Sequence, residues 1–113
     1  MSPQELAQAI LAEPRITLAT RHVSGVQDEA TARHNIEQTA AGQPARRSSY
    51  GNAPGGTVEL SAEMLSAILD LARRFTFSIS EIAGASHSKR SRHYAGVGFD
   101  VNVIDGRRVG ADH

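Results

Sequence analysis

Residues 91–101 read SRHYAGVGFDV and decide how the second half of the chain is built. Two glycines, Gly96 and Gly98, lead from a loop that carries His93 into an apolar run that contains Asp100. Strand interiors usually exclude both Gly and Asp. The stretch therefore predicts a strand over residues 97–104 whose polar positions serve something other than packing.

Side chains alternate between the two faces of a strand. The apolar positions of this run would face the core: Val97, Phe99, Val101 and Val103. The other face would show Gly98, Asp100 and Asn102. Gly98 would leave open space beside Asp100, and Gly96 would let the loop bend close to the sheet and bring His93 toward Asp100. Imidazole and carboxylate together suit a zinc ion, although a solvated strand face with a loop histidine is the simpler alternative.

The rest of the chain alternates helical and extended patterns. Ser2, Pro3 and Glu5 form a capping box that starts a helix ending near Glu13. Residues 16–20 predict a short strand, and Asp28 is placed as the cap of a second helix that runs to residue 41. Residues 42–57 are rich in Gly, Pro, Ser and Asn and predict a long loop.

The clearest helix follows this loop. Apolar positions between Leu60 and Phe75 recur at helical spacing behind Ser61 as the cap. Residues 75–80 alternate as a strand, and Asp105-Gly106 marks a hairpin turn after residue 104. These elements predict an α+β fold with a small antiparallel sheet flanked by helices.

Composition narrows the classes of function. The 113 residues suit a single domain, and 12 basic residues balance 12 acidic ones, which favours neither nucleic acid nor an anionic membrane as partner. No apolar run reaches the roughly 18 residues of a membrane span, and the first residues do not form a secretory signal. Cysteine is absent, so any metal site must use His, Asp and Glu.

The same stretch resembles the signature Ser-x-His-x-x-Gly-x-Ala-x-Asp of the zinc D-Ala-D-Ala peptidases, a family that includes lysostaphin-type enzymes and the hedgehog signalling domain. Ser91, His93, Gly96 and Asp100 match in order, and Gly98 stands where Ala is usual. Residues 84–88, GASHS, are similar to the family's lead-in, and the hairpin VNVIDGRRV is also similar. The resemblance covers roughly residues 76–112.

The resemblance implies a hedgehog/DD-peptidase-like fold in which His93 and Asp100 are two of three protein ligands of a catalytic zinc. The metal would activate water against an amide bond next to a D-amino acid of a peptidoglycan peptide. His87 and Arg92 would bind substrate, and Ser91 would either bind substrate as well or support the loop. Many carboxypeptidases of the family have an Arg where this chain has Ser80-Glu81, so an endopeptidase is expected rather than a carboxypeptidase.

In the family, the third ligand and the general base follow the hairpin, but this chain ends at His113. We therefore expect a single peptidase-like domain that is incomplete at its C-terminus, with a helical and loop part over 1–57 and the metal hairpin in 58–113. His113 is one alternative for the third ligand and His87 the next. A two-residue turn would place His113 on the Asp100 face, whereas the hydrophobic pattern favours a three-residue loop, with Gly106 as a bulge, that turns it away.

Two functions are consistent with these features. The first is a zinc-dependent peptidoglycan peptidase that acts at the cell wall, in phage lysis or wall remodelling. Without a signal peptide, it would stay cytoplasmic until release or be secreted by a route that this chain does not encode. The alternative is a peptidoglycan-binding pseudo-enzyme that lacks the third ligand and does not cut. A purely structural domain would leave the glycine-bracketed Asp100 unexplained.

Overall fold

The computed structural model describes residues 1–109. Within this range the helices are α1 (Pro3–Ala12), α2 (Ala32–Ala40) and α3 (Ala62–Ala72). The strands are β1 (Ile16–Leu18), β2 (Ala45–Arg46), β3 (Thr57–Val58), β4 (Phe77–Glu81), β5 (Asp100–Ile104) and β6 (Arg107–Arg108). The expected α+β class is confirmed.

Local capping explains where the helices begin. The Ser2–Glu5 capping box of α1 and the Ser61 cap of α3 are both present, as predicted. The predicted cap of α2 is wrong, because Thr31, not Asp28, accepts the N–H of His34 at the start of that helix. The carboxylate of Asp28 instead contacts other loops, as described below.

The main sheet has the strand order β1-β4-β5-β6. β1 runs parallel to β4, whereas the β4–β5 and β5–β6 pairs are antiparallel. The prediction of a purely antiparallel sheet is therefore wrong at the β1 edge. Two helices, α2 and α3, lie between β1 and β4 in the chain, and such a long crossover is what lets two strands pair in parallel.

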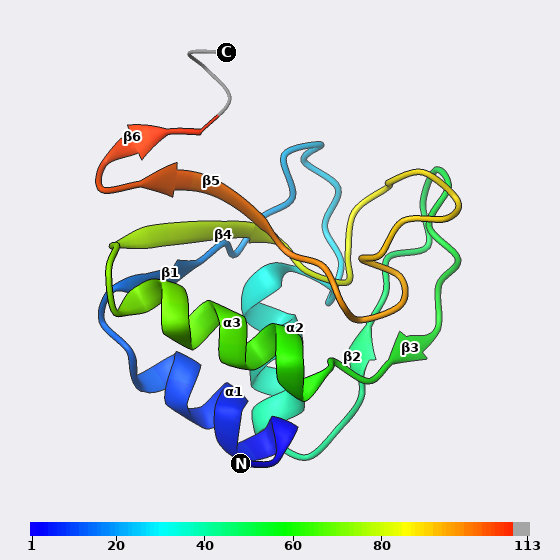
Figure 1. Ribbon diagram of the computed structural model, residues 1–113. Coiled ribbons are helices and arrows are strands. Elements are labelled where there is room, and N and C mark those ends of the chain that lie inside the picture. The colour runs from blue at the N-terminus through cyan, green and yellow to red at the C-terminus, as the bar shows by residue number, and fades with distance from the viewer. Residues whose placement is uncertain (110–113) are drawn as a thin grey trace.

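All three helices lie together on one side of this sheet (Figure 1). They share one hydrophobic cluster with β1 and β4, in which Leu65, Ile68 and Ile79 are fully buried. Leu6 and Ile36, from the first 57 residues, belong to the same cluster. Both parts of the chain therefore contribute to one core.

The strand that carries Asp100 is shorter than predicted. It begins at Asp100, and Val97 lies outside it with 46% of its surface exposed, so the expected core role of Val97 is wrong. Phe99 and Val101 are only partly buried, but both pack against the core. The β4–β5 register is irregular on both sides of Ile79, which breaks the simple two-residue alternation.

The hairpin after β5 has a two-residue turn, with Ile104 paired to Arg107. The three-residue loop that the hydrophobic pattern favoured is wrong. Asp105 and Gly106 both have positive φ, as such a turn requires, and the Asp105 carboxylate accepts the N–H of Thr76. Val109 is 44% exposed, so core burial does not impose the other register. His113 lies outside the described residues.

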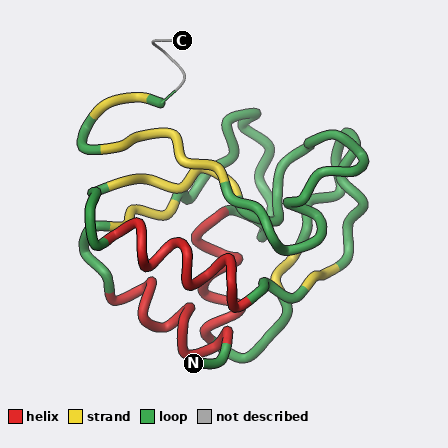
Figure 2. Tube along the Cα trace, viewed as in Figure 1, coloured by secondary structure: helices red, strands yellow, loops and turns green. Residues whose placement is uncertain are grey.

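The longest loops gather on one side of the molecule, away from α1 (Figure 2). They lead from β1 to α2, from β2 to β3 and from β4 to β5. Among residues 1–109, no helix combines the length and the apolar character needed to cross a bilayer.

Candidate metal centre

The loop between β4 and β5 brings His93 to the start of β5. His93 Nε2 lies 3.1 Å from Asp100 Oδ1, so the predicted approach of these two residues is confirmed. The His93 side chain is 12% exposed and that of Asp100 is 50% exposed. The pair therefore lies at the surface with its imidazole largely covered and its carboxylate open to solvent.

The backbone fixes the tautomer of His93. Its Nδ1 lies 2.6 Å from the carbonyl oxygen of Ile82. A carbonyl oxygen only accepts, so Nδ1 must carry the proton, and in the neutral ring Nε2 keeps a lone pair. A histidine that donates one nitrogen to a backbone carbonyl and leaves the other free has the arrangement typical of a metal ligand.

His87 joins this pair. Its ring stacks on that of His93 with the centroids 3.9 Å apart and the planes 3° from parallel. One nitrogen of each histidine and one carboxylate oxygen of Asp100 lie within 4.8 Å of one another, so these three residues could hold a metal ion. The sequence placed His87 among the substrate-binding residues and, after His113, as the second alternative for the third ligand; the structure brings it beside His93 and Asp100.

His87 is held in the same way as His93. Its Nε2 donates to the carbonyl oxygen of Gly84 at 2.9 Å, which leaves Nδ1 without a proton in the neutral ring. Burial of the imidazole and the charge of the neighbouring His93 lower the pKa of His87. At neutral pH the ring is therefore uncharged and able to act as a ligand.

The contact between His93 and Asp100 needs a positive charge. With the proton on Nδ1, the lone pair of Nε2 faces an oxygen of the carboxylate across 3.1 Å. This arrangement is repulsive unless a second proton or a metal cation lies there. The nearby His87 would give such a cation a third possible ligand.

Neighbouring residues hold the loop in place by hydrogen bonds and do not belong to the group of possible ligands. Ser91 Oγ accepts the N–H of His93 at 3.2 Å, so Ser91 supports the loop as expected. Arg92 is exposed, and its carbonyl accepts the N–H groups of Ala95 and Val97. Tyr94, which the sequence did not single out, is 7% exposed and its hydroxyl accepts the N–H of His87.

The two glycines serve close packing. A Cβ on Gly98 would lie 3.3 Å from Arg92 Cβ and 3.3 Å from the backbone nitrogen of His93. The predicted open space beside Asp100 is therefore wrong at this position. Gly96 has a φ of 75°, and a Cβ there would lie 2.3 Å from the carbonyl oxygen of Glu59. Gly96 thus bends the loop onto the start of α3 rather than onto the sheet.

A hollow of about 270 Å³ adjoins the cluster. Its lining includes His87, Asp100 and Glu81, together with Val23 and Tyr50 from two other loops. Glu81 and Asp100 are cross-strand partners, which places two acidic residues side by side. Like charges in that position repel, and each carboxylate has an imidazole partner, His22 for Glu81 and His93 for Asp100.

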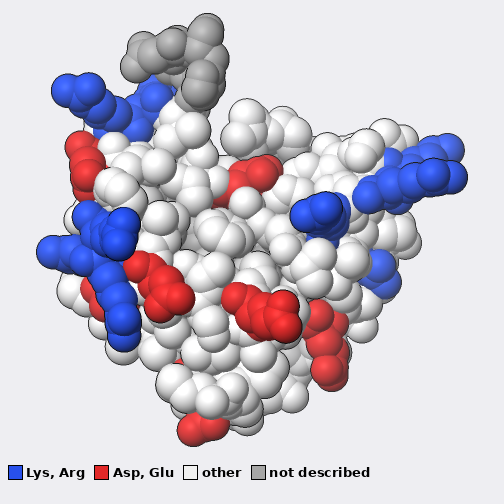
Figure 3. Space-filling model, in the orientation of Figure 1, with Lys and Arg blue, Asp and Glu red and all other residues white. Residues whose placement is uncertain are grey.

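Charge is mixed over the face of the molecule shown in Figure 3. Lys and Arg side chains gather toward its left and right edges, and Asp and Glu side chains lie at the left edge and across the middle.

No family model, no curated protein and no solved structure matches this chain.

Proposed function

We propose that the chain carries the metal centre of a zinc-dependent peptidoglycan peptidase, with His93, Asp100 and His87 as protein ligands. The observation that supports it best is the His93–Asp100 contact, in which Nε2 and Oδ1 face each other at 3.1 Å beside a second imidazole. Two histidines and a carboxylate form a ligand set that zinc accepts in catalytic sites. The substrate class rests on the resemblance of residues 84–101 to the D-Ala-D-Ala peptidases.

The residues themselves supply orientation. The carbonyl oxygens of Ile82 and Gly84 each accept an N–H from one imidazole, so both rings are already oriented before an ion binds. Tyr94 donates to the carbonyls of Ala85 and His87 and ties the two ends of the loop together. When bound, zinc would activate a water molecule and polarise the amide carbonyl.

The hollow beside the cluster favours cleavage within a peptide. Many carboxypeptidases of the resembling family have an Arg where this chain has Ser80-Glu81, and Glu81, which lines the hollow, has both carboxylate oxygens turned to His22 and offers no cation for a terminal carboxylate. Val23, 91% exposed, and Tyr50 offer apolar surface next to the metal ligands. The hollow therefore suits an internal segment of a stem peptide or cross-bridge.

Calorimetric titration of the chain with Zn²⁺ tests the metal centre. We expect one ion per chain for the wild type and no saturable binding for His93→Ala or Asp100→Asn, because each removes a ligand atom. His34→Ala is the matched control, since His34 lies on α2 and contacts Thr31 instead of the cluster. Equal binding by wild type and His93→Ala would contradict the proposed centre.

Turnover is measured separately, as new amino groups released from purified peptidoglycan by the zinc-loaded chain. Release that disappears in His93→Ala would support the peptidase. Zinc binding together with retention on peptidoglycan, but without release, would favour the non-catalytic binding module instead.

A further inference from the structure

A further histidine, His22, is buried against the loop between β4 and β5, next to Gly84. The His22 side chain has no exposed surface, and both of its nitrogens face carboxylates. Its Nδ1 lies 2.8 and 2.9 Å from the two oxygens of Glu81, and its Nε2 lies 2.5 Å from Asp28 Oδ1. Glu81 is at the end of β4, whereas Asp28 comes from the loop before α2.

This geometry suits a charged imidazole. When Glu81 and Asp28 are both ionised, their oxygens only accept hydrogen bonds, so both nitrogens of His22 must donate, and only the imidazolium form can do so. Burial of the ring opposes its protonation, but the hydrogen bonds with Glu81 and Asp28 outweigh it and raise the pKa of His22. Burial also raises the pKa of Glu81, which the hydrogen bond from His22 offsets only in part.

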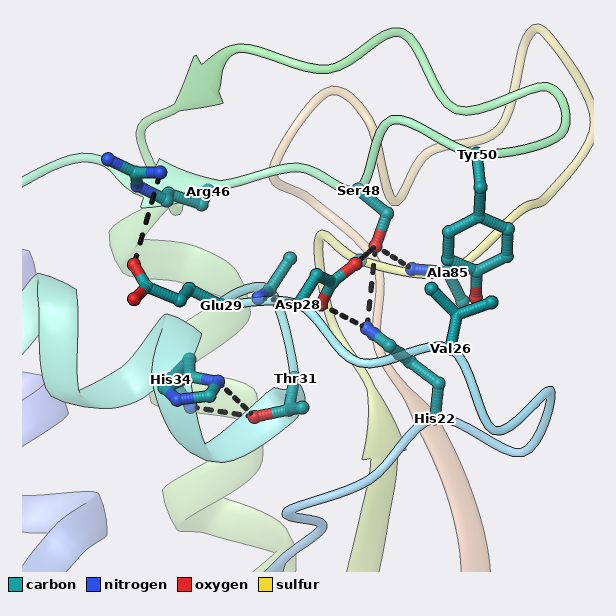
Figure 4. A network of polar contacts seen from close by, with 12 residues as sticks. His22, Val26, Asp28, Glu29, Thr31, His34, Arg46, Ser48, Tyr50 and Ala85 are labelled. Carbon is teal, nitrogen blue, oxygen red and sulfur yellow. Dashed lines mark hydrogen bonds and ion pairs between the residues drawn. The ribbon is translucent and has the colours of Figure 1, made fainter.

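The network extends to the metal loop through Ser48. Ser48 Oγ donates to Asp28 Oδ2 at 2.7 Å and accepts the N–H of Ala85 at 2.9 Å. Figure 4 shows Ser48 between these partners, with His22 beside them. Ala85 has a φ of 68°, which is unfavourable for a residue with a Cβ, so this hydrogen bond holds a strained conformation.

Gly84 also contacts the network directly. A Cβ at this position would lie 2.9 Å from His22 Cε1 and 1.9 Å from the carbonyl oxygen of Ala30. The backbone of residue 84 is therefore pressed against the buried ring. The carbonyl of the same residue accepts the ring Nε2–H of His87, so the position of Gly84 sets the orientation of a proposed metal ligand.

From these contacts we infer that His22 is a positioning residue for the metal centre: held between Glu81 and Asp28, it fixes residues 84 and 85 in the conformation that presents His87. This inference rests on the metal centre proposed above. Loss of the His22 proton would leave two carboxylates around a neutral ring, release one of the two contacts and loosen residues 84–87. Metal affinity should then fall at high pH, although the ligands themselves lose competing protons there.

The groups around His22 are few in the described chain. The charges that act on the ring come from Glu81 on β4 and Asp28 in the loop before α2. Ser48 and the ring of Tyr50 face it from the loop between β2 and β3. His87, beyond Gly84, is near enough for its own pKa to be lowered by the charge of His22.

The test uses the whole chain with two variants and a control. His22→Gln cannot bridge both carboxylates as a cation, and Ser48→Ala removes the link to Ala85 but keeps the His22 contacts. His34→Gln is the control, because it makes the same chemical change outside the network. Two measurements are made across pH: amide hydrogen exchange of residues 85–87 in the metal-free chain, and zinc affinity against a competing chelator.

We expect the wild type to protect these amides until His22, followed by NMR, loses its proton, and then to expose them together. Zinc affinity should fall over the same pH range. His22→Gln and Ser48→Ala should lower zinc affinity by about 10- to 100-fold, the range found for residues that orient metal ligands, and should lack the fall at high pH. The control should match the wild type.

If both variants show the same amide exchange and the same zinc affinity as the wild type, the inference is overturned. A His22 titration that leaves the amides of residues 85–87 unchanged would also overturn it. If His22→Gln does not fold, Ser48→Ala decides the outcome. If the wild type binds no zinc, the proposed function fails, whereas the exchange measurement in the metal-free chain still supports or overturns the holding of residues 84–87 by His22.

Discussion

The half of the molecule built from α1, α3 and β4 differs in kind from the side formed by its long loops. In the first, one apolar face of each element is buried, and residues such as Leu65, Ile68 and Ile79 are fully enclosed. In the second, polar side chains join segments that are far apart in the chain: His22 and Glu81 are 59 residues apart, and Ser48 and Ala85 are 37 apart.

The difference teaches that stability and site geometry have separate origins in this protein. Apolar packing is non-directional and tolerates small shifts of a neighbour. Hydrogen bonds lose their strength with modest changes in distance or angle, so the loop side is the more sensitive to displacement. Changes in the packed half should lower stability, and changes on the loop side should alter metal binding first.

The largest effect on stability should come from Leu65→Ala. Leu65 has no exposed surface and lies in the middle of α3, and truncation of such a residue costs about 2–5 kcal/mol. Chemical denaturation should show this loss, while the zinc affinity of the folded fraction stays at the wild-type value. A large change in affinity at full folding would show that the two halves are coupled.

Gly84→Ala should lower both the stability of the fold and the zinc affinity. The new methyl group would collide with the backbone of Ala30, and a cost of about 3 kcal/mol is expected, at the upper end for overpacking. Because residue 84 also orients His87, zinc affinity should fall as well. Gly25→Ala is the comparison for a loop glycine outside the site: a Cβ there meets nothing within 4 Å, so its cost comes only from its φ of 83°, and zinc affinity should not change. Unchanged zinc affinity in Gly84→Ala would remove Gly84 from the site.

Stability should depend on pH in a direction set by His22. Its pKa is raised in the folded state, so its contribution is complete below the unfolded pKa and is lost as pH rises through the folded one. The raised pKa of Glu81 acts in the same direction. Each unit by which the pKa of His22 is raised is worth about 1.4 kcal/mol. Denaturation of wild type and His22→Gln should therefore converge as pH rises; a constant gap would argue against the charged ring.

The loss of stability at low pH should come from Asp28. Hydrogen bonds from Ser48 and His22 lower its pKa against the opposing effect of burial. The stability it contributes is present above its unfolded pKa and is lost as pH falls through the lowered value. In Asp28→Asn, the free energy of unfolding from denaturation curves should fall less as the pH is lowered. If the variant is as sensitive to acid as the wild type, other carboxylates cause the loss.

The smallest effect should come from Ser61→Ala. Ser61 accepts the N–H of Met64 and caps α3, and removal of such a cap costs about 1 kcal/mol. Thermal unfolding should show a modest drop with no change in zinc affinity. An altered affinity would indicate that Ser61 influences the metal loop through its N–H, which donates to the carbonyl of Gly96.

Local patterns predicted much of the packed half and the core of the site. The capping box of α1, the Ser61 cap of α3, the alternation through β4 and the turn at Asp105-Gly106 all depend on residues a few positions apart. The His93–Asp100 contact was predicted for the same reason, because it spans only seven residues. Interactions of this range are visible in a sequence, since the backbone between the partners has few conformations.

The tertiary structure alone decided the parallel pairing of β1 with β4, the role of Asp28, the place of His87 beside His93 and the burial of His22. A polar residue in a loop has no periodicity, so its pattern does not reveal a partner 59 positions away. Which loops meet is determined by how α2 and α3 carry the chain across the sheet, and that depends on the packing of the whole core. The sequence by itself thus determined the helices, the strands of the main sheet and the approach of His93 to Asp100. The fold decided what surrounds that pair and holds it in place, and it also paired β2 with β3, so the prediction of a plain loop over 42–57 was wrong there.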